Sequence, residues 1–216
     1  MGLPDPKLIT FDIFGTVLDW RTGLRETLHR HGRELADADF DRVIDRQGEL
    51  ESGAYRPYAE IFAESLVDVL AMSPADARAI GRNIGTWPLY PDSREALARL
   101  MQIAPCAAIS NSDRAHGEDV QAQLGFRLSH WICAEDARCY KPARAAWRFA
   151  GDRIGAAFDG SWWHVSAYGD YDLVAARELG LTGVFIARSH HRPGPAAISA
   201  ASLDELVTSI FRAVSR

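Results

Sequence analysis

The sequence predicts an α/β fold, in which helices cover both faces of a parallel sheet and a block of helices is inserted after the first strand. Short apolar segments bounded by turn residues alternate with segments of helical periodicity along most of the chain. Between about residues 20 and 91 only helical patterns occur. We therefore expect an α/β core domain made of residues 1–18 and 91–216, and a helical domain at 19–90.

The expected strands are five short apolar segments, namely Leu8–Phe11, Cys106–Ser110, Trp131–Cys133, Trp163–Ser166 and Gly183–Ala187. Core helices are expected at about 92–102, 114–124, 142–154, 172–179 and Leu203–Ala213. In the inserted segment the helical patterns lie at about 22–35, 39–52, 58–71 and 74–84. The last of these begins with Ser73 and Pro74, a capping residue followed by proline at the first helical position.

Composition and charge exclude several classes of partner. The formal net charge of the 216 residues is −5, and no basic region dominates, which argues against nucleic acid. No apolar segment approaches the roughly 20 residues that a membrane-spanning helix needs. The first residues, MGLPDPKLITFD, lack a basic stretch followed by a long apolar one. We therefore expect a cytoplasmic protein that binds no membrane.

Polar residues stand directly after the predicted strands. Asp12 follows the first strand, Ser110 and Asn111 end the second, Lys141 lies in the loop after the third, and Asp172 follows the fourth. Ligands of open parallel sheets bind at the carboxyl ends of the strands. Each residue alone is also a normal cap or turn former. Together they predict one site, in which Ser110 and Asn111 can donate hydrogen bonds to an anion.

The chemistry expected of this site centres on Asp12. A carboxylate can act as a nucleophile if it stays ionised, and a nearby Lys141 would hold it in that form. Asp172 can fix the lysine or a water molecule, and Thr16 lies in the tight turn just beyond the nucleophile. We therefore predict Asp12, Lys141 and Asp172 as catalytic residues.

Four segments resemble the motifs of the haloacid dehalogenase superfamily, in the same order along the chain. They are Asp12-Ile-Phe-Gly-Thr-Val, Ser110-Asn111, Tyr140-Lys141-Pro142 and Asp172-Leu-Val-Ala-Ala-Arg-Glu-Leu-Gly-Leu. The resemblance implies a Rossmann-like parallel sheet core, an inserted helical cap subdomain and a hydrolase with an aspartate nucleophile.

Phe14 points to one branch of that superfamily. Its phosphatases carry a second aspartate at this position, which protonates the leaving alcohol, and a phenyl ring cannot donate a proton. The L-2-haloacid dehalogenase branch carries an aromatic residue there, and Asp19-Trp20-Arg21 is also similar to that branch. The resemblance implies that Asp12 displaces halide from a small 2-haloalkanoate. Water then hydrolyses the aspartyl ester and releases a 2-hydroxy acid.

Further roles follow from the same resemblance. Arg46, in the segment RQGELE, is similar to the arginine that receives the halide, with Asn111 beside it. Ser110 would bind the substrate carboxylate, and Phe14 and Trp20 would line the substrate slot. The expected partner is a small anionic substrate, and a homodimer through the cap is compatible with this interpretation.

Other features keep alternatives open. Magnesium-binding members supply acids four or five residues before the last motif aspartate, where this chain has Tyr168 and Ala167. We therefore expect no metal and no cofactor, with magnesium only in a phosphatase. Ala167, Gly169 and Trp147 also stand where the best-known dehalogenases carry Ser, Asn and Tyr. A magnesium-dependent phosphatase, a hydrolase of a carboxylate-bearing strained ring, and a binding protein without turnover remain as alternatives.

Overall fold

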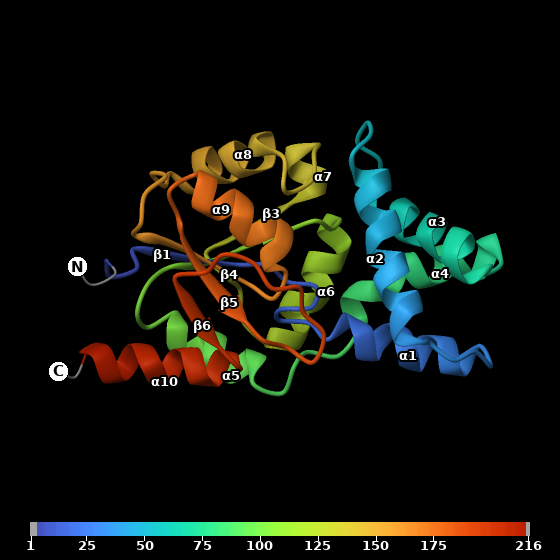
Figure 1. Cartoon of the computed structure of the whole chain (residues 1–216), viewed down its shortest axis with the longest axis horizontal. Helices are drawn as coiled ribbons and strands as arrows, with labels where there is room; N and C mark the ends of the chain where they lie inside the picture. Colours follow the sequence, from blue (N-terminus) through green and yellow to red (C-terminus); the bar gives the residue numbers. More distant parts are fainter. Residues whose placement is uncertain (1–3, 215–216) are drawn as a thin grey trace.

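The core is a parallel sheet of six strands in the order β3-β2-β1-β4-β5-β6 (Figure 1). We describe it from a computed structural model, which covers residues 4–214. The strands are β1 (Leu8–Phe11), β2 (Cys106–Ser110), β3 (His130–Cys133), β4 (Trp162–Ser166), β5 (Thr182–Ile186) and β6 (Ile198–Ala200). Five of them lie within one residue of the prediction at each end. The sixth, β6, was not predicted, and it pairs only with β5.

The central strand β1 explains the position of the site. It pairs with β2 on one side and β4 on the other, with Ile9 opposite Cys106 and Trp163. All four residues of β1 are buried, as expected for a parallel strand covered on both faces. The strand order therefore reverses at β1, and Asp12 follows at its carboxyl end, where such sheets bind ligands.

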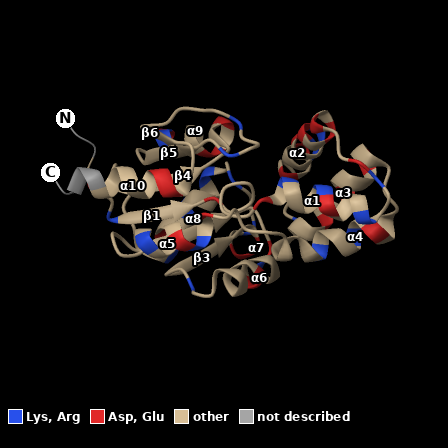
Figure 2. Cartoon of the chain, turned by 90° about the horizontal axis from the view of Figure 1, so that it is seen from below, with Lys and Arg blue, Asp and Glu red and all other residues tan. Residues whose placement is uncertain are grey.

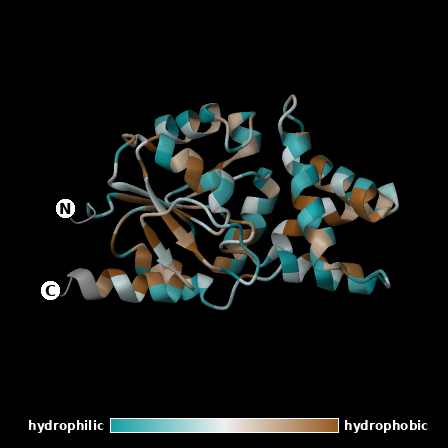
Figure 3. Cartoon of the chain, viewed as in Figure 1, coloured by the Kyte–Doolittle hydropathy of each residue, from teal (hydrophilic) through white to brown (hydrophobic). Residues whose placement is uncertain are grey.

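Helices cover both faces of the sheet (Figures 1 and 3). One face packs against α5 (Ser93–Leu100), α6 (Arg114–Leu124) and α10 (Leu203–Val214). The other packs against α8 (Arg144–Ile154) and α9 (Val174–Glu178), with Trp147 and Trp162 in its core. A short helix, α7 (Ala134–Ala137), follows β3. Figure 3 shows apolar strands inside and hydrophilic outer helix faces. The fold is thus the predicted Rossmann-like α/β class.

Four helices between β1 and α5 form a separate block, which we call the helical insert. It comprises α1 (Trp20–Arg30), α2 (Asp37–Glu51), α3 (Tyr58–Leu70) and α4 (Pro74–Asn83), followed by a 3₁₀ turn at Ile84–Thr86. Figure 1 shows the insert beside the sheet, and Figure 2 shows acidic residues along α2. The Ser73 hydroxyl accepts a hydrogen bond from the Asp76 amide at 3.1 Å, as the sequence predicted for the start of α4.

The helices of the insert occupy most of the 19–90 segment. That this segment is a domain separate from the α/β core stays a prediction. Across residues 4–214, no helix has the length and apolar character that a membrane crossing would require.

Candidate active site

Lys141 lies between two carboxylates at the carboxyl end of the sheet. Its Nζ atom donates to Asp12 Oδ1 at 3.0 Å and to Asp172 Oδ2 at 2.8 Å, and all three side chains are buried. The Thr16 hydroxyl donates to the other oxygen of Asp12 at 2.8 Å. Because both oxygens of Asp12 accept hydrogen bonds, the geometry is that of an ionised carboxylate. The structure thus brings together Asp12, Thr16, Lys141 and Asp172, as the sequence predicted.

Burial and charge act against each other in this triad. Burial raises the pKa of Asp12, while the Lys141 ammonium and the Thr16 hydroxyl oppose that shift. Burial acts in the same direction on Asp172, but Lys141 and His164 outweigh it and lower the pKa to about 2. The two carboxylates in turn outweigh the effect of burial on Lys141 and raise its pKa. Lys141 therefore stays protonated and holds both acids.

The turn after β1 fixes the geometry of Asp12. Gly15 has a φ angle of +91°, a conformation that side chains disfavour. A Cβ atom at this position would lie 2.4 Å from Tyr168 Cε2, so the turn needs glycine for space as well. The Thr16 hydroxyl also accepts from the Ala167 amide at 2.9 Å. Thr16 thereby ties the turn after β1 to the loop after β4.

A buried chain of hydrogen bonds supports Asp172 from behind. His164 Nε2 lies 3.2 Å from Asp172 Oδ2, and His164 Nδ1 lies 2.8 Å from the Thr10 hydroxyl. The Trp162 indole N–H donates to the same hydroxyl at 2.8 Å. Its place within a strand indicated a buried, hydrogen-bonded histidine and not a base, and both ring nitrogens indeed have partners. His164 stands opposite Thr10 on the neighbouring strand.

A cavity of about 830 Å³ lies over Asp12 between the core and the insert. Phe14, Trp20 and Tyr58 give it apolar surface, and Lys141 also reaches it. Ser110 lines the cavity as well, and its buried hydroxyl has no hydrogen-bond partner among the described residues. The predicted substrate residues Phe14, Trp20 and Ser110 therefore lie around one cavity, and Ser110 offers a free donor.

Asn111 lines the same cavity but is fully engaged in the protein. Its Nδ2 atom donates to Glu51 Oε2 at 3.0 Å and to the Lys141 carbonyl at 2.9 Å. Its Oδ1 atom accepts from the Lys141 amide at 2.7 Å. Both amide hydrogens are thus used. In this arrangement Asn111 cannot also donate to a halide, the role that was predicted for it.

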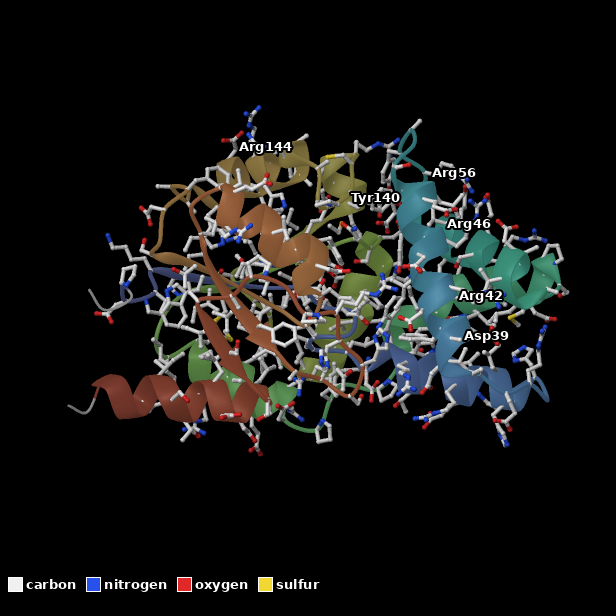
Figure 4. All side chains as sticks on the ribbon, in the orientation of Figure 1. Asp39, Arg42, Arg46, Arg56, Tyr140 and Arg144 are labelled. Atoms are coloured by element: carbon white, nitrogen blue, oxygen red, sulfur yellow. The ribbon has the colours of Figure 1, made fainter. Side chains whose placement is uncertain are left out.

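The structure does not bring Arg46 to the site. Its guanidinium group contacts Glu49 and Asp68 at 2.8 Å each, and Glu64 at 3.8 Å. Figure 4 shows Arg46 on the side of α2 that faces α3, away from the sheet. It is Asp45, one residue earlier, that lines the cavity. The predicted halide role of Arg46 conflicts with this geometry, because consecutive helical residues point about 100° apart.

Glu51 is the residue that sequence reasoning missed. It is the last residue of α2, is half-buried, and lines the cavity together with Asp12. Burial raises the pKa of its carboxyl group to about 8, against the opposing effects of Asn111 and Lys141. No motif marks such a residue, because its environment arises only when the insert packs on the core.

The residues do not fit a magnesium site. Hard cations take several oxygen ligands, and the two central carboxylates already share the Lys141 ammonium. Positions 167 and 168 are alanine and tyrosine, and the Asp170 carboxylate lies 3.8 Å from the Arg192 guanidinium. Within residues 4–214, no group of three or more His, Cys, Asp or Glu is arranged to hold a metal ion.

The chain matches the family model of the haloacid dehalogenase-like hydrolases over residues 6–162. It therefore belongs to this family of hydrolases, which agrees with the resemblance seen in its motifs. No protein of curated function matches the chain.

Several solved structures of L-2-haloacid dehalogenases are similar to this chain. The defluorinating L-2-haloacid dehalogenase Rha0230 is 25% identical, with a TM-score of 0.79 over 95% of both chains. The L-2-haloacid dehalogenase PA0810 is also 25% identical, with a TM-score of 0.80 over 95% of this chain and 99% of that one. The L-2-haloacid dehalogenase from Xanthobacter autotrophicus, at 17% identity, has a TM-score of 0.82 over 95% and 98% of the two chains. At that identity it shows a shared fold.

Proposed function

We propose that this hydrolase is a 2-haloacid dehalogenase that uses Asp12 as its nucleophile. The observation that carries the proposal is the ion pair between Asp12 and Lys141 at the cavity. Phe14 stands two residues after this aspartate, where a phosphatase would carry its second acid. An ionised carboxylate can attack carbon, and the side chain at position 14 cannot protonate an alcohol. Likeness to two L-2-haloacid dehalogenases at 25% identity supports the same reaction.

The proposed reaction has two steps. One oxygen of Asp12 attacks the halogen-bearing carbon in line, a C–O bond forms, and halide leaves with the electron pair of the C–X bond. Water then attacks the carboxyl carbon of the aspartyl ester and releases a 2-hydroxy acid. Lys141 orients the nucleophile, and Asp172 orients Lys141. Alignment and exclusion of bulk water would supply most of the acceleration.

The cavity fits a small acid with an apolar part. The free hydroxyl of Ser110 suits the substrate carboxylate, and Phe14, Trp20 and Tyr58 suit its alkyl part. The cavity of about 830 Å³ has room for haloacetates and for 2-haloalkanoates with longer chains.

Glu51 favours one alternative, hydrolysis of a strained ring that bears a carboxylate. Such a ring would use the same attack by Asp12 and the same carboxylate site. Its ring heteroatom needs a proton on leaving, and Glu51 is an acid with a pKa of about 8 in the same cavity.

A single-turnover experiment in isotopically labelled water tests the proposal. With excess enzyme and 2-bromopropionate, heavy oxygen should enter the Asp12 carboxyl group and should be absent from the first product. It should appear in the product only after a second portion of substrate is added. Asp12→Asn should release no halide and should stay folded. Release of halide with label only in the product, and none in Asp12, would contradict the ester intermediate.

A further inference from the structure

Glu51 is an acidic side chain that the insert brings to the cavity of the nucleophile, and the displacement at Asp12 gives it no task. It lies at the carboxyl-terminal end of α2 and lines the cavity together with Asp12 and Lys141. Asn111 Nδ2 donates to its Oε2 atom at 3.0 Å, which joins the insert to the loop after β2. Its carboxyl group is thereby held in one place at the cavity that Asp12 also lines.

We propose that Glu51 donates the proton, or the hydrogen bond, that the leaving group needs at its departure. The inference rests on the function proposed above and adds a substrate class. These substrates are 2-haloacids whose leaving group accepts hydrogen bonds strongly, above all fluoroacids. Two arginines also line the cavity: Arg192 is paired with Asp41 and Asp45, and the Arg138 guanidinium lies over the Tyr55 ring. The residues that were predicted to receive the halide do not supply a donor here. Arg46 faces α3, Asn111 has no free amide hydrogen, and Phe14 has none to give.

The surroundings of Glu51 keep its carboxyl group neutral. Burial penalises the carboxylate, and Asp172 and Asp12 add negative potential, which together raise its pKa to about 8. The negative end of the helix dipole also disfavours an anion at the last residue of α2. Within residues 4–214, its one side-chain hydrogen bond comes from Asn111 to Oε2. Oε1 is therefore the oxygen left to carry the proton.

The proton balance is closed over the two steps. The bond from Asp12 oxygen to carbon forms as the carbon–fluorine bond breaks, and the departing fluoride takes the proton of Glu51. Hydrolysis of the ester by water gives the 2-hydroxy acid, restores the Asp12 carboxylate and releases one proton. That proton returns to Glu51. The net reaction is fluoroacid plus water to hydroxy acid plus hydrogen fluoride.

Tyrosine hydroxyls are the competing donors of the cavity. Tyr58 and Tyr140 donate to Gln47 and to the Arg56 carbonyl, and the Tyr168 hydroxyl lies 3.0 Å from His190 Nδ1. Tyr55 and Tyr171 also line the cavity. Their phenylalanine variants are therefore compared with Glu51→Gln.

The test compares two leaving groups in Glu51→Gln, which keeps the shape and the bond to Asn111 but has no acidic proton. We expect kcat for fluoroacetate to fall about 10²- to 10³-fold, and kcat for bromoacetate to fall less than about tenfold. Wild-type kcat for fluoroacetate should decrease above about pH 8, and that decrease should be absent from the variant. Glu60→Gln is the matched control, since Glu60 is an exposed acid of α3 paired with Arg56 outside the cavity.

Several outcomes would overturn the assignment. Equal losses for both substrates in Glu51→Gln would mean a structural role. A fluoride-selective loss in Tyr55→Phe or Tyr171→Phe, and not in Glu51→Gln, would assign the donor to tyrosine. If the wild type releases neither halide, the function proposed above fails and the leaving-group role fails with it. Infrared spectroscopy tests the neutral acid without any substrate. The wild type should show the band of a protonated carboxyl group, and only Glu51→Gln should remove it. If the wild type lacks this band, Glu51 is not a neutral acid.

Discussion

The ammonium group of Lys141 lies 3.0 Å from Asp12 Oδ1, and both side chains are almost completely buried. The same ammonium lies 2.8 Å from Asp172, so one cation serves two buried carboxylates. Removal of the cation would leave both buried acids without their shared ammonium group, and an uncompensated buried charge costs more than the ion pair itself contributes. Stability and activity are thus coupled at this residue.

Lys141→Met should abolish halide release and lower the free energy of unfolding by about 3–5 kcal/mol at neutral pH. In the wild type, the lowered pKa of Asp172 contributes stability that is present above its ordinary pKa and is lost as the pH falls through about 2. Without the ammonium, burial raises the pKa values of the acids, so the variant should lose stability as the pH rises. Urea denaturation at several pH values between about 5 and 8 measures this.

Lys7 supplies the control for that series, because it is an exposed lysine at the other end of β1. Lys7→Met should match the wild type at every pH. The coupling argument fails if Lys141→Met shows the wild-type pH dependence, or if its stability loss grows on acidification.

Ser110→Ala should raise KM for a 2-haloacid about ten- to hundredfold, with a smaller effect on kcat. The Ser110 hydroxyl is buried at the cavity without a protein partner, so a substrate carboxylate is the acceptor it fits. A hydrogen bond to a charged group contributes about 1.5–3 kcal/mol, which sets that range. Steady-state kinetics measure the effect. Ser112→Ala is the control, because the Ser112 hydroxyl is also buried without a partner among the described residues but does not line the cavity. Equal KM values in both variants would mean that Ser110 does not bind the substrate carboxylate.

Gly15→Ala should impair both folding stability and turnover. The left-handed conformation costs a side chain about 1–2 kcal/mol, and the new Cβ would also lie 2.4 Å from Tyr168 and 2.8 Å from Trp20 Nε1. Gly32→Ala isolates the first effect, because Gly32 has a φ of +68° with no atom within 4 Å of an added Cβ. Thermal unfolding should therefore show a larger loss for Gly15→Ala than for Gly32→Ala, and only Gly15→Ala should lose activity. Equal melting temperatures would contradict the close contact.

Arg46→Gln should leave kcat and KM for a 2-haloacid unchanged within error. The side chain contacts Glu49 of α2 and Glu64 and Asp68 of α3, and it does not line the cavity. Halide-release kinetics over a range of substrate concentrations test this. Arg42→Gln, on the same helix and paired with Asp39, should behave identically, and a large KM effect in Arg46→Gln alone would return Arg46 to the substrate site.

Local patterns were sufficient where the chain itself carries the information. The buried strand β1 and the polar residues after β1, β2 and β4 could be read directly, because strands of a parallel sheet are continuous apolar segments and their carboxyl ends converge. The edge strand β6 was missed, since Ile198–Ala200 has three residues and acquires its structure from pairing with β5.

Side-chain directions in the insert could not be read in the same way. An error of one residue turns a helical position by about 100°, which separates Asp45 at the cavity from Arg46 on the face that contacts α3. The acidity of Glu51 depends on burial against the core and on Asp12 and Asp172, which are far away in sequence. Only the packed molecule defines it.

Glu51→Gln should also change how the stability of the protein depends on pH, independently of any substrate. Packing raises the pKa of Glu51 from its ordinary 4.5 to about 8. A group whose pKa is raised on folding contributes stability that is fully present below its unfolded pKa and is lost as the pH rises through the folded pKa. The glutamine does not titrate, so the difference in unfolding free energy between variant and wild type isolates this group.

That difference should be nearly constant below about pH 4.5 and should move in favour of the variant up to about pH 8, at no more than about 1.4 kcal/mol per pH unit. Denaturant titrations of both proteins across this range measure it, with Glu60→Gln expected to show no such trend. A flat difference would mean that Glu51 ionises normally in the folded protein. It would then be a carboxylate beside Asp12 at neutral pH, unable to give a proton to any leaving group.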